Sequence, residues 1–223
     1  MSEPLTVRQL RRRWKPAKDR LAAEQDNHPT AIRFHRACSW LQRVESMGDD
    51  EDHDLRLTCQ WIAFNALYGQ WDAAKSEPRP DRECWRAFLD RIRSLDADNA
   101  LPAMLTTHKK LVHAILDDAY LAGFFWKEPS KQRATQTTRD RRHAERWYLA
   151  EEWGTILDHV MDRIYFLRCQ LIHGAATHNS KLNRKSLKRC TTMLDHVLQA
   201  VLIVWIDHGS DQDWGLMCYP PVG

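Results

Sequence analysis

Residues 183–206 read NRKSLKRCTTMLDHVLQAVLIVWI, and this stretch decides the fold class. Its apolar side chains recur at intervals of three, four and seven residues, which places them on one face of an α-helix. These residues are Leu187, Leu194, Val197, Leu198, Val201 and Leu202. Asn183 can cap this helix, because an asparagine side chain accepts a hydrogen bond from the free N–H groups of a first turn. The pattern predicts a long core helix.

The segments before this helix repeat the helical pattern. Further helices are expected over residues 30–44, 55–68, 81–92, 101–126, 139–157 and 158–173. Asp81 can cap the third of them, residues 101–126 form one long helix or two joined ones, and a break is expected near Gly154. No stretch alternates for long enough to predict a strand. We therefore expect an all-α protein, an antiparallel helical bundle with short connections.

The two ends of the chain differ from this helical region in composition. Residues 1–29 are polar and rich in lysine and arginine, and they predict a basic N-terminal arm. Such an arm is either solvated and partly disordered or in contact with phosphate groups. Residues 30–208 form the predicted helical domain, and residues 209–223 form a C-terminal tail.

Composition indicates a cytoplasmic protein. The formal net charge of +3 is too small to identify a partner by itself. No two cysteines have CxxC spacing and most lie in apolar helical patterns, so we expect reduced, mostly buried thiols. The six are Cys38, Cys59, Cys84, Cys169, Cys190 and Cys218. We see no secretory leader and no apolar run of about 20 residues, and therefore expect no membrane segment.

The residues suited to catalysis lie in residues 166–174, FLRCQLIHG. Three apolar residues are expected to anchor this helix to the core: Leu167, Leu171 and Ile172. Gly174 is expected to end the helix, because glycine adopts the left-handed conformation without strain. A histidine moves protons near neutral pH, and an arginine fork stabilises extra negative charge on a phosphorane. Arg168 and His173 therefore suit chemistry on a phosphodiester.

The spacing of Arg168 and His173 resembles the R-x4-6-H signature of the HEPN superfamily, the higher eukaryotes and prokaryotes nucleotide-binding fold. The surrounding residues 171–177, LIHGAAT, look like the motif region of bacterial Apea-like HEPN proteins. Residues 61–68, WIAFNALY, and 35–41, HRACSWL, look like their early core helices. The resemblance covers most of the chain, from residue 30 to residue 206.

The resemblance implies a helical homodimer that assembles around the motif helices, with Arg168 and His173 as the functional pair. It also implies RNase activity in a toxin–antitoxin or antiviral defence system. Active HEPN ribonucleases often place a polar residue directly after the arginine, whereas this chain has Cys169. The alternative is a non-catalytic HEPN module that binds nucleotide or RNA, or that partners an antitoxin or another defence component.

RNA carries its own nucleophile, the 2′-OH group, so its cleavage needs no metal. The reaction requires a base, an acid and a cation on the phosphate, and a two-fold dimer offers two motif histidines and two motif arginines. The expected product is a 2′,3′-cyclic phosphate. We expect no cofactor, and His173 with His178 or Cys169 lacks the other ligands of a zinc site.

Two basic clusters are candidates for RNA binding, although such clusters are often only solvated faces. The first follows the motif: Lys181, Arg184, Lys185, Lys188 and Arg189. The second precedes it: Lys131, Arg133, Arg139, Arg141 and Arg142. Asn65 and Tyr165 are supporting candidates, since each is either a satisfied core residue or a group that positions Arg168. Tryptophans at helical spacing, among them Trp40, Trp61, Trp85 and Trp205, are expected in the core.

Overall fold

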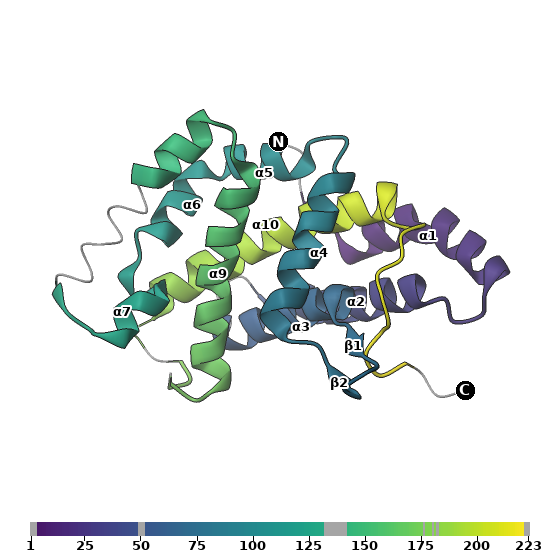
Figure 1. Cartoon of the computed structure of the whole chain (residues 1–223), viewed down its shortest axis with the longest axis horizontal. Coiled ribbons are helices and arrows are strands. Elements are labelled where there is room, and N and C mark those ends of the chain that lie inside the picture. The colour runs from purple at the N-terminus through teal and green to yellow at the C-terminus, as the bar shows by residue number, and fades with distance from the viewer. Residues whose placement is uncertain are drawn as a thin grey trace. The chain divides into compact units, whose positions relative to one another are not determined.

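The computed structural model describes residues 4–48, 52–131, 142–175, 177–179, 181 and 183–220, and it is 72% helical (Figure 1). The predicted all-α class is confirmed. The strands in these ranges, β1 (Trp71–Asp72) and β2 (Glu77–Pro78), have two residues each and pair antiparallel. The chain divides into two compact units. Unit 1 comprises Met1–Asp49, Cys59–Ala100 and Leu198–Gly223, and unit 2 comprises Asp50–Thr58 and Leu101–Val197.

Unit 1 contains three of the first four helices whole, and it contains α3 from Cys59 onward. These helices are α1 (Val7–Glu24), α2 (Pro29–Glu45), α3 (His53–Tyr68) and α4 (Asp81–Leu95). The predicted ranges for α2 and α3 agree with these bounds to within two residues. Asp81 is the first residue of α4 rather than its cap. Pro80 takes the cap position, and no side chain caps this helix by a hydrogen bond.

Helix α1 corrects the expectation of a solvated N-terminal arm. Its apolar residues Val7, Leu10, Trp14 and Leu21 are buried, and the ring of Trp14 stacks on Phe34 with centroids 4.7 Å apart. Its basic residues are all exposed on the remaining surface: Arg8, Arg11, Arg12, Arg13, Lys15, Lys18 and Arg20. The segment is therefore an amphipathic helix packed into unit 1.

The predicted C-terminal tail is also part of unit 1. Trp205, near the end of α10 (Arg184–His208), stacks on Trp214 with ring centroids 4.3 Å apart. The backbone N–H of Trp71 donates to the carbonyl of Leu216 at 3.0 Å, so the C-terminal segment runs beside β1 (Figure 1). Apolar burial of two indole rings stabilises this packing.

The segment from residue 100 to residue 127 contains shorter helices than the sequence predicts. The stretch expected as one or two helices is four: α5 (Ala100–Thr107), α6 (Lys109–Leu116), the 3-10 helix η1 (Ala119–Leu121) and α7 (Gly123–Lys127). Residues 142–149 are helical, and α9 spans Trp153–Ile172. The predicted break lies at residues 150–152, where Glu151 has a φ of 54°, and Gly154 is inside α9.

Helix α10 is the one helix among the described residues that is long and apolar enough to cross a membrane. Within the structure 67% of its most apolar window is buried. Such burial is typical of a core helix in a soluble protein, as the sequence predicts. None of the six cysteines, all in the described ranges, forms a disulfide, and four of them are buried.

Candidate functional site

The C-terminal end of α9 carries the predicted catalytic motif. His173 is the capping residue, and its backbone N–H donates to the carbonyl of Cys169 at 3.0 Å. Gly174 has a φ of 70° and donates to the carbonyl of Leu171 at 3.1 Å, and Ala175 donates to the carbonyl of Gln170 at 2.8 Å. This pair of bonds is a Schellman motif, which fixes the direction of the chain at a helix end. The prediction that Gly174 ends the helix is confirmed.

Replacing Gly174 with alanine should destabilise this helix end by about 1–2 kcal/mol, the cost of a left-handed conformation for a residue with a Cβ. Nothing lies within 4 Å of an added Cβ, so no steric clash contributes. Urea unfolding of the variant measures the loss. Gly174→Asn should lose less stability, because asparagine tolerates this conformation. Equal stability of wild type and Gly174→Ala would contradict the assignment of Gly174 as the left-handed residue that ends α9.

The motif side chains differ in exposure. Arg168, Cys169 and Tyr165 are half-buried on α9, and His173 is exposed. Leu167 is buried as predicted, whereas Ile172 is 52% exposed and does not anchor the helix. Leu171, the third residue expected to anchor the helix, is half-buried. The end of α9 thus presents His173 to solvent and holds Arg168 closer to the protein.

Asn65 lies in unit 1, whereas Arg168 lies in unit 2. The amide nitrogen of Asn65 is 3.2 Å from both the hydroxyl of Tyr68 and Oδ1 of Asp81. The Tyr68 hydroxyl donates to the same Asp81 oxygen at 2.5 Å. These contacts join α3 to the start of α4. They agree with the alternative in which the Asn65 amide is a structural group satisfied by a neighbouring helix end.

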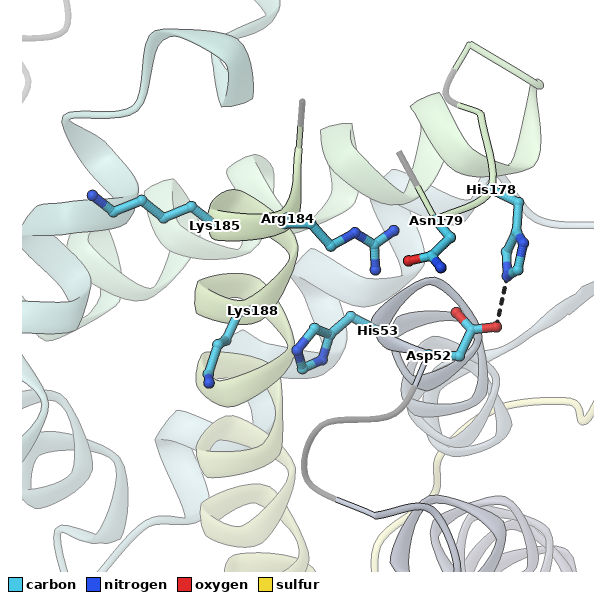
Figure 2. A pocket seen from close by; sticks show the side chains of 7 residues that line it. All are labelled: Asp52, His53, His178, Asn179, Arg184, Lys185 and Lys188. Carbon is cyan, nitrogen blue, oxygen red and sulfur yellow. Dashed lines mark hydrogen bonds and ion pairs between the residues drawn. The ribbon is translucent and has the colours of Figure 1, made fainter. Parts of the chain in front are cut away.

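A pocket of about 430 Å³ in unit 2 collects part of the first basic cluster. Its lining comes from the first turns of α10, the start of α3 and the loop after α9: Arg184, Lys185, Lys188, Asp52, His53, His178 and Asn179. Figure 2 shows Arg184 and Asn179 pointing toward one another. Sequence reasoning identified the three basic residues of α10 but missed Asp52, His53 and Asn179.

The acidic groups at this pocket are neutralised by their neighbours. The guanidinium of Arg184 contacts Oδ2 of Asp54, which also accepts the N–H of Asn179 at 3.1 Å. Oδ2 of Asp52 lies 2.8 Å from Nε2 of His178, and its other oxygen accepts the N–H groups of Asp54 and Leu55, both at 3.0 Å. The ammonium groups of Lys185 and Lys188 therefore give the pocket a positive potential.

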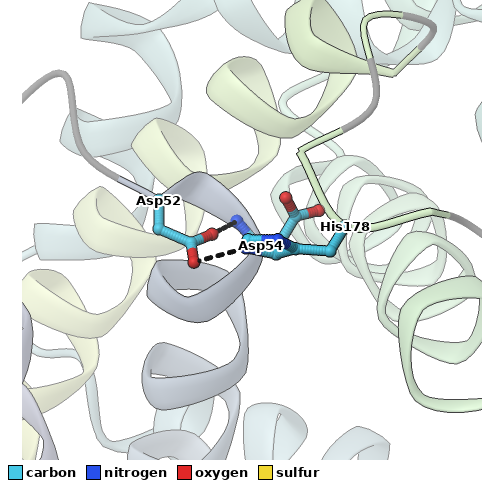
Figure 3. Close-up of side chains that lie close together, drawn as sticks. All are labelled: Asp52, Asp54 and His178. Atoms are coloured by element: carbon cyan, nitrogen blue, oxygen red, sulfur yellow. Dashed lines mark hydrogen bonds and ion pairs between the residues drawn. The ribbon is translucent and has the colours of Figure 1, made fainter.

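Three of these groups also have the chemistry of cation ligands. Oxygen or nitrogen atoms of Asp52, Asp54 and His178 lie within 4.8 Å of one another (Figure 3). The contact with Arg184 already occupies Oδ2 of Asp54, whose Oδ1 is buried without a hydrogen-bond partner among the described residues, and the contact with His178 occupies Oδ2 of Asp52. A divalent ion would have to displace a guanidinium and an imidazole, so we interpret the group as an ion-pair network.

The Asp52–His178 contact makes a prediction about pH. Its hydrogen bond and charge raise the pKa of His178. Burial opposes ionisation of Asp52, but the hydrogen bonds from His178 and the backbone outweigh it and lower the pKa of Asp52. The stabilising ion pair is therefore lost as the pH rises through the raised pKa of His178, and also as the pH falls through the lowered pKa of Asp52.

Asp52→Asn should return the pKa of His178 toward about 6.5, the ordinary value of histidine. An NMR titration of the His178 ring protons measures the change. Asp117→Asn, which removes an exposed carboxylate elsewhere in unit 2, is the matched control and should leave His178 unchanged. An unshifted His178 in Asp52→Asn would show that the contact is absent in solution.

The other predicted basic residues lie apart from this pocket. Arg189 lines a second pocket of about 270 Å³ with Lys110, His113, Ala114, Asp117 and Asp118. Its guanidinium is 3.8 Å from Asp118 and 3.4 Å from the carbonyl of Ala114. Lys181, Lys131 and Arg142 are exposed. Arg133, Arg139 and Arg141 lie outside the described residues.

No protein-family model, curated protein or solved structure matches this chain. The described residues form an all-α protein in which His173 is the C-terminal capping residue of α9. A cationic pocket lies where the following loop enters α10.

Proposed function

We propose that this protein is a metal-independent endoribonuclease of HEPN type. The observation that carries the proposal is the end of α9, where the Schellman motif holds His173 in solvent on the helix that carries Arg168. The loop from His173 leads within eleven residues to Arg184 of the cationic pocket. His173, Arg168 and the pocket, the groups proposed here as acid–base group, cation and phosphate-binding surface, all belong to unit 2.

The chemistry needs only groups that RNA and the protein supply. A base removes the proton of a 2′-OH group, the oxygen attacks the adjacent phosphorus, and an acid protonates the departing 5′-oxygen. His173 transfers these protons, and Arg168 stabilises the charge of the pentacoordinate phosphorus. The products are a 2′,3′-cyclic phosphate and a 5′-hydroxyl.

A homodimer completes the set of groups, because one chain contributes one motif histidine. The side chain of Ile172, which directly precedes His173, is 52% exposed, and a dimer that assembles around the motif helices would cover it. Light scattering should find a dimer at micromolar concentration, and Ile172→Asp should shift it toward monomer. A monomeric wild type would contradict the two-chain site.

The cationic pocket supports the choice of RNA as substrate. Lys185, Lys188 and Arg184 lie on the first two turns of α10, where the helix dipole also favours anions. Phosphate contacts of this kind make affinity fall steeply with salt. We expect Lys185→Ala and Lys188→Ala to reduce that salt dependence.

The same pocket also favours a second candidate function, a non-catalytic RNA-binding module. Cys169 follows Arg168 where a polar residue would help to hold the guanidinium, and such a module would act through an antitoxin or defence partner. In either case we propose that the protein is cytoplasmic and acts as a toxin or antiviral defence effector. Incubating the protein with labelled RNA and EDTA separates the two candidates, because only the first shortens the RNA.

A further inference from the structure

An aromatic cluster lies exposed on unit 2, in the segment that the sequence predicts as part of a long helix. Tyr120 is 56% exposed and Trp126 is 46% exposed, and their ring centroids are 6.2 Å apart at an interplanar angle of 49°. Phe125 packs edge-on against both, with centroids 5.4 Å and 5.3 Å away. Trp61, Trp85 and Trp205 are buried as predicted, whereas the prediction for Trp40 is wrong, because its side chain on α2 is 40% exposed. Trp126 is the second exposed tryptophan, and it lies in unit 2.

Hydrogen bonds fix this cluster to the end of α9. The carbonyl of Tyr120 accepts the indole N–H of Trp126 at 2.9 Å and the amide of Gln170 at 3.1 Å. Gln170 lies three residues before His173, and Gly123 at the start of α7 lies against the ring of Phe166 on α9. The rings are thus held in place beside the helix that carries the motif.

A second connection joins the cluster to the basic start of α10. Asp118 caps η1 by accepting the N–H of Tyr120 at 3.1 Å. The hydroxyl of Ser186, on the first turn of α10, donates to the other oxygen of Asp118 at 2.6 Å. The 3-10 helix η1 also contacts α9 and α7. The cluster therefore lies between the motif helix and the helix that bears the cationic pocket.

We propose that Tyr120 and Trp126 form a stacking platform for unpaired bases of single-stranded RNA. The proposal rests on RNA being the ligand of the proposed function. Exposed aromatic faces beside cationic side chains are the usual means of binding single strands, because every base has a π-face and every nucleotide a phosphate.

One exposed cation lies next to the rings, because Lys127 directly follows Trp126. Glu128 and Asp117 are exposed in the same segment, and Arg189 lies 3.8 Å from Asp118, so Lys127 is the side chain that suits a phosphate. Asp118 is held by Ser186, Arg189 and the backbone of Tyr120, and its side chain is largely buried. A duplex would present its bases to one another rather than to the rings, so the platform should select single strands.

The test uses single-stranded RNA that contains 2-aminopurine, whose fluorescence is quenched by stacking. The protein is His173→Ala, so that the RNA is not consumed. Trp126→Ala should weaken binding roughly 5- to 150-fold, the range for losing one stacked base, and abolish the quenching. Tyr120→Ala should act in the same direction, and Trp126→Phe should keep most of the affinity.

Trp40→Ala is the matched control, because Trp40 is 40% exposed but lies in unit 1. It should bind as tightly as the parent, and circular dichroism should show equal helix content in all variants. Unchanged RNA affinity and quenching in Trp126→Ala would overturn the proposal. A change of oligomeric state with unchanged affinity would also overturn it and assign the rings to a contact between copies.

The experiment also separates this proposal from the proposed function. Tight, Trp126-dependent binding by a wild type that never cleaves RNA would retain the platform and reject the nuclease. Cleavage that is indifferent to Trp126→Ala would retain the nuclease and reject the platform.

Discussion

His173→Ala and Arg168→Ala should each abolish detectable RNA cleavage. Removing a positioned acid–base group costs about 10²–10⁴-fold in rate, and removing a donor that stabilises transition-state charge costs about 10²–10³-fold. His173 is exposed and Arg168 is half-buried, so helix content should be unchanged in both variants. Initial rates on a labelled single-stranded RNA, with EDTA present, measure the loss.

The controls distinguish a catalytic pair from a general loss of charge. His143→Ala and Arg146→Ala remove exposed residues of the same types from the 142–149 helix of unit 2, and both should cleave at the wild-type rate. Arg168→Lys should fail, because an ammonium cannot reproduce the two-pronged contact of a guanidinium. Persistent cleavage by His173→Ala would falsify the assignment.

Cys169→Asn should raise the cleavage rate, because an amide beside Arg168 can hold the guanidinium by a hydrogen bond. The thiol of Cys169 is only a weak donor and acceptor. Comparison of initial rates in EDTA measures the gain. A lower rate in Cys169→Asn would show that the cysteine itself contributes to the site.

Arg33→Met should produce the largest loss of stability, about 3–5 kcal/mol out of the 5–15 kcal/mol typical of a domain. Arg33 is 1% exposed, and burial lowers its pKa to about 10. Its guanidinium donates to the carbonyls of Leu67, Gly69, Trp214 and Gly215 at 2.7–3.4 Å. Methionine fills the volume of the stem but leaves these carbonyls without donors.

Urea unfolding followed by tryptophan fluorescence measures this loss. Arg36→Met is the control, since Arg36 lies one turn later and donates to the carbonyls of Cys218 and Tyr219 nearer the chain end. We expect it to cost about 1 kcal/mol, because those carbonyls can turn to water instead. Equal midpoints for Arg33→Met and wild type would mean that the buried network is not formed.

The helical class was predictable because apolar periodicity is local. Residues 184–208 and the glycine stop at Gly174 follow from spacing and backbone preference alone. The same signal existed in α1, where Val7, Leu10, Trp14 and Leu21 recur at helical intervals. It was missed because seven basic residues dominate the composition of that segment, although all of them lie on the exposed face.

Of the residues that line the pocket, the sequence predicted as binding residues only the basic ones that α10 contributes. The acidic side of the pocket joins Asp52 to His178, which are 126 residues apart in the sequence. The acidic run around Asp52 has the composition of a solvated connection, and nothing local indicates that two of its carboxylates meet Arg184 and His178. Long-range ion pairs of this kind depend on tertiary packing, which composition and spacing do not encode.

The central claim, metal-independent cleavage by Arg168 and His173, is tested most directly by the ends of the RNA fragments made in EDTA. We expect a 2′,3′-cyclic phosphate on the upstream fragment and a 5′-hydroxyl on the downstream one. The matching deoxyribonucleotide strand should stay intact, because it lacks the 2′-OH nucleophile. Fragments with 3′-hydroxyl and 5′-phosphate ends, or cleavage that stops in EDTA, would contradict the account.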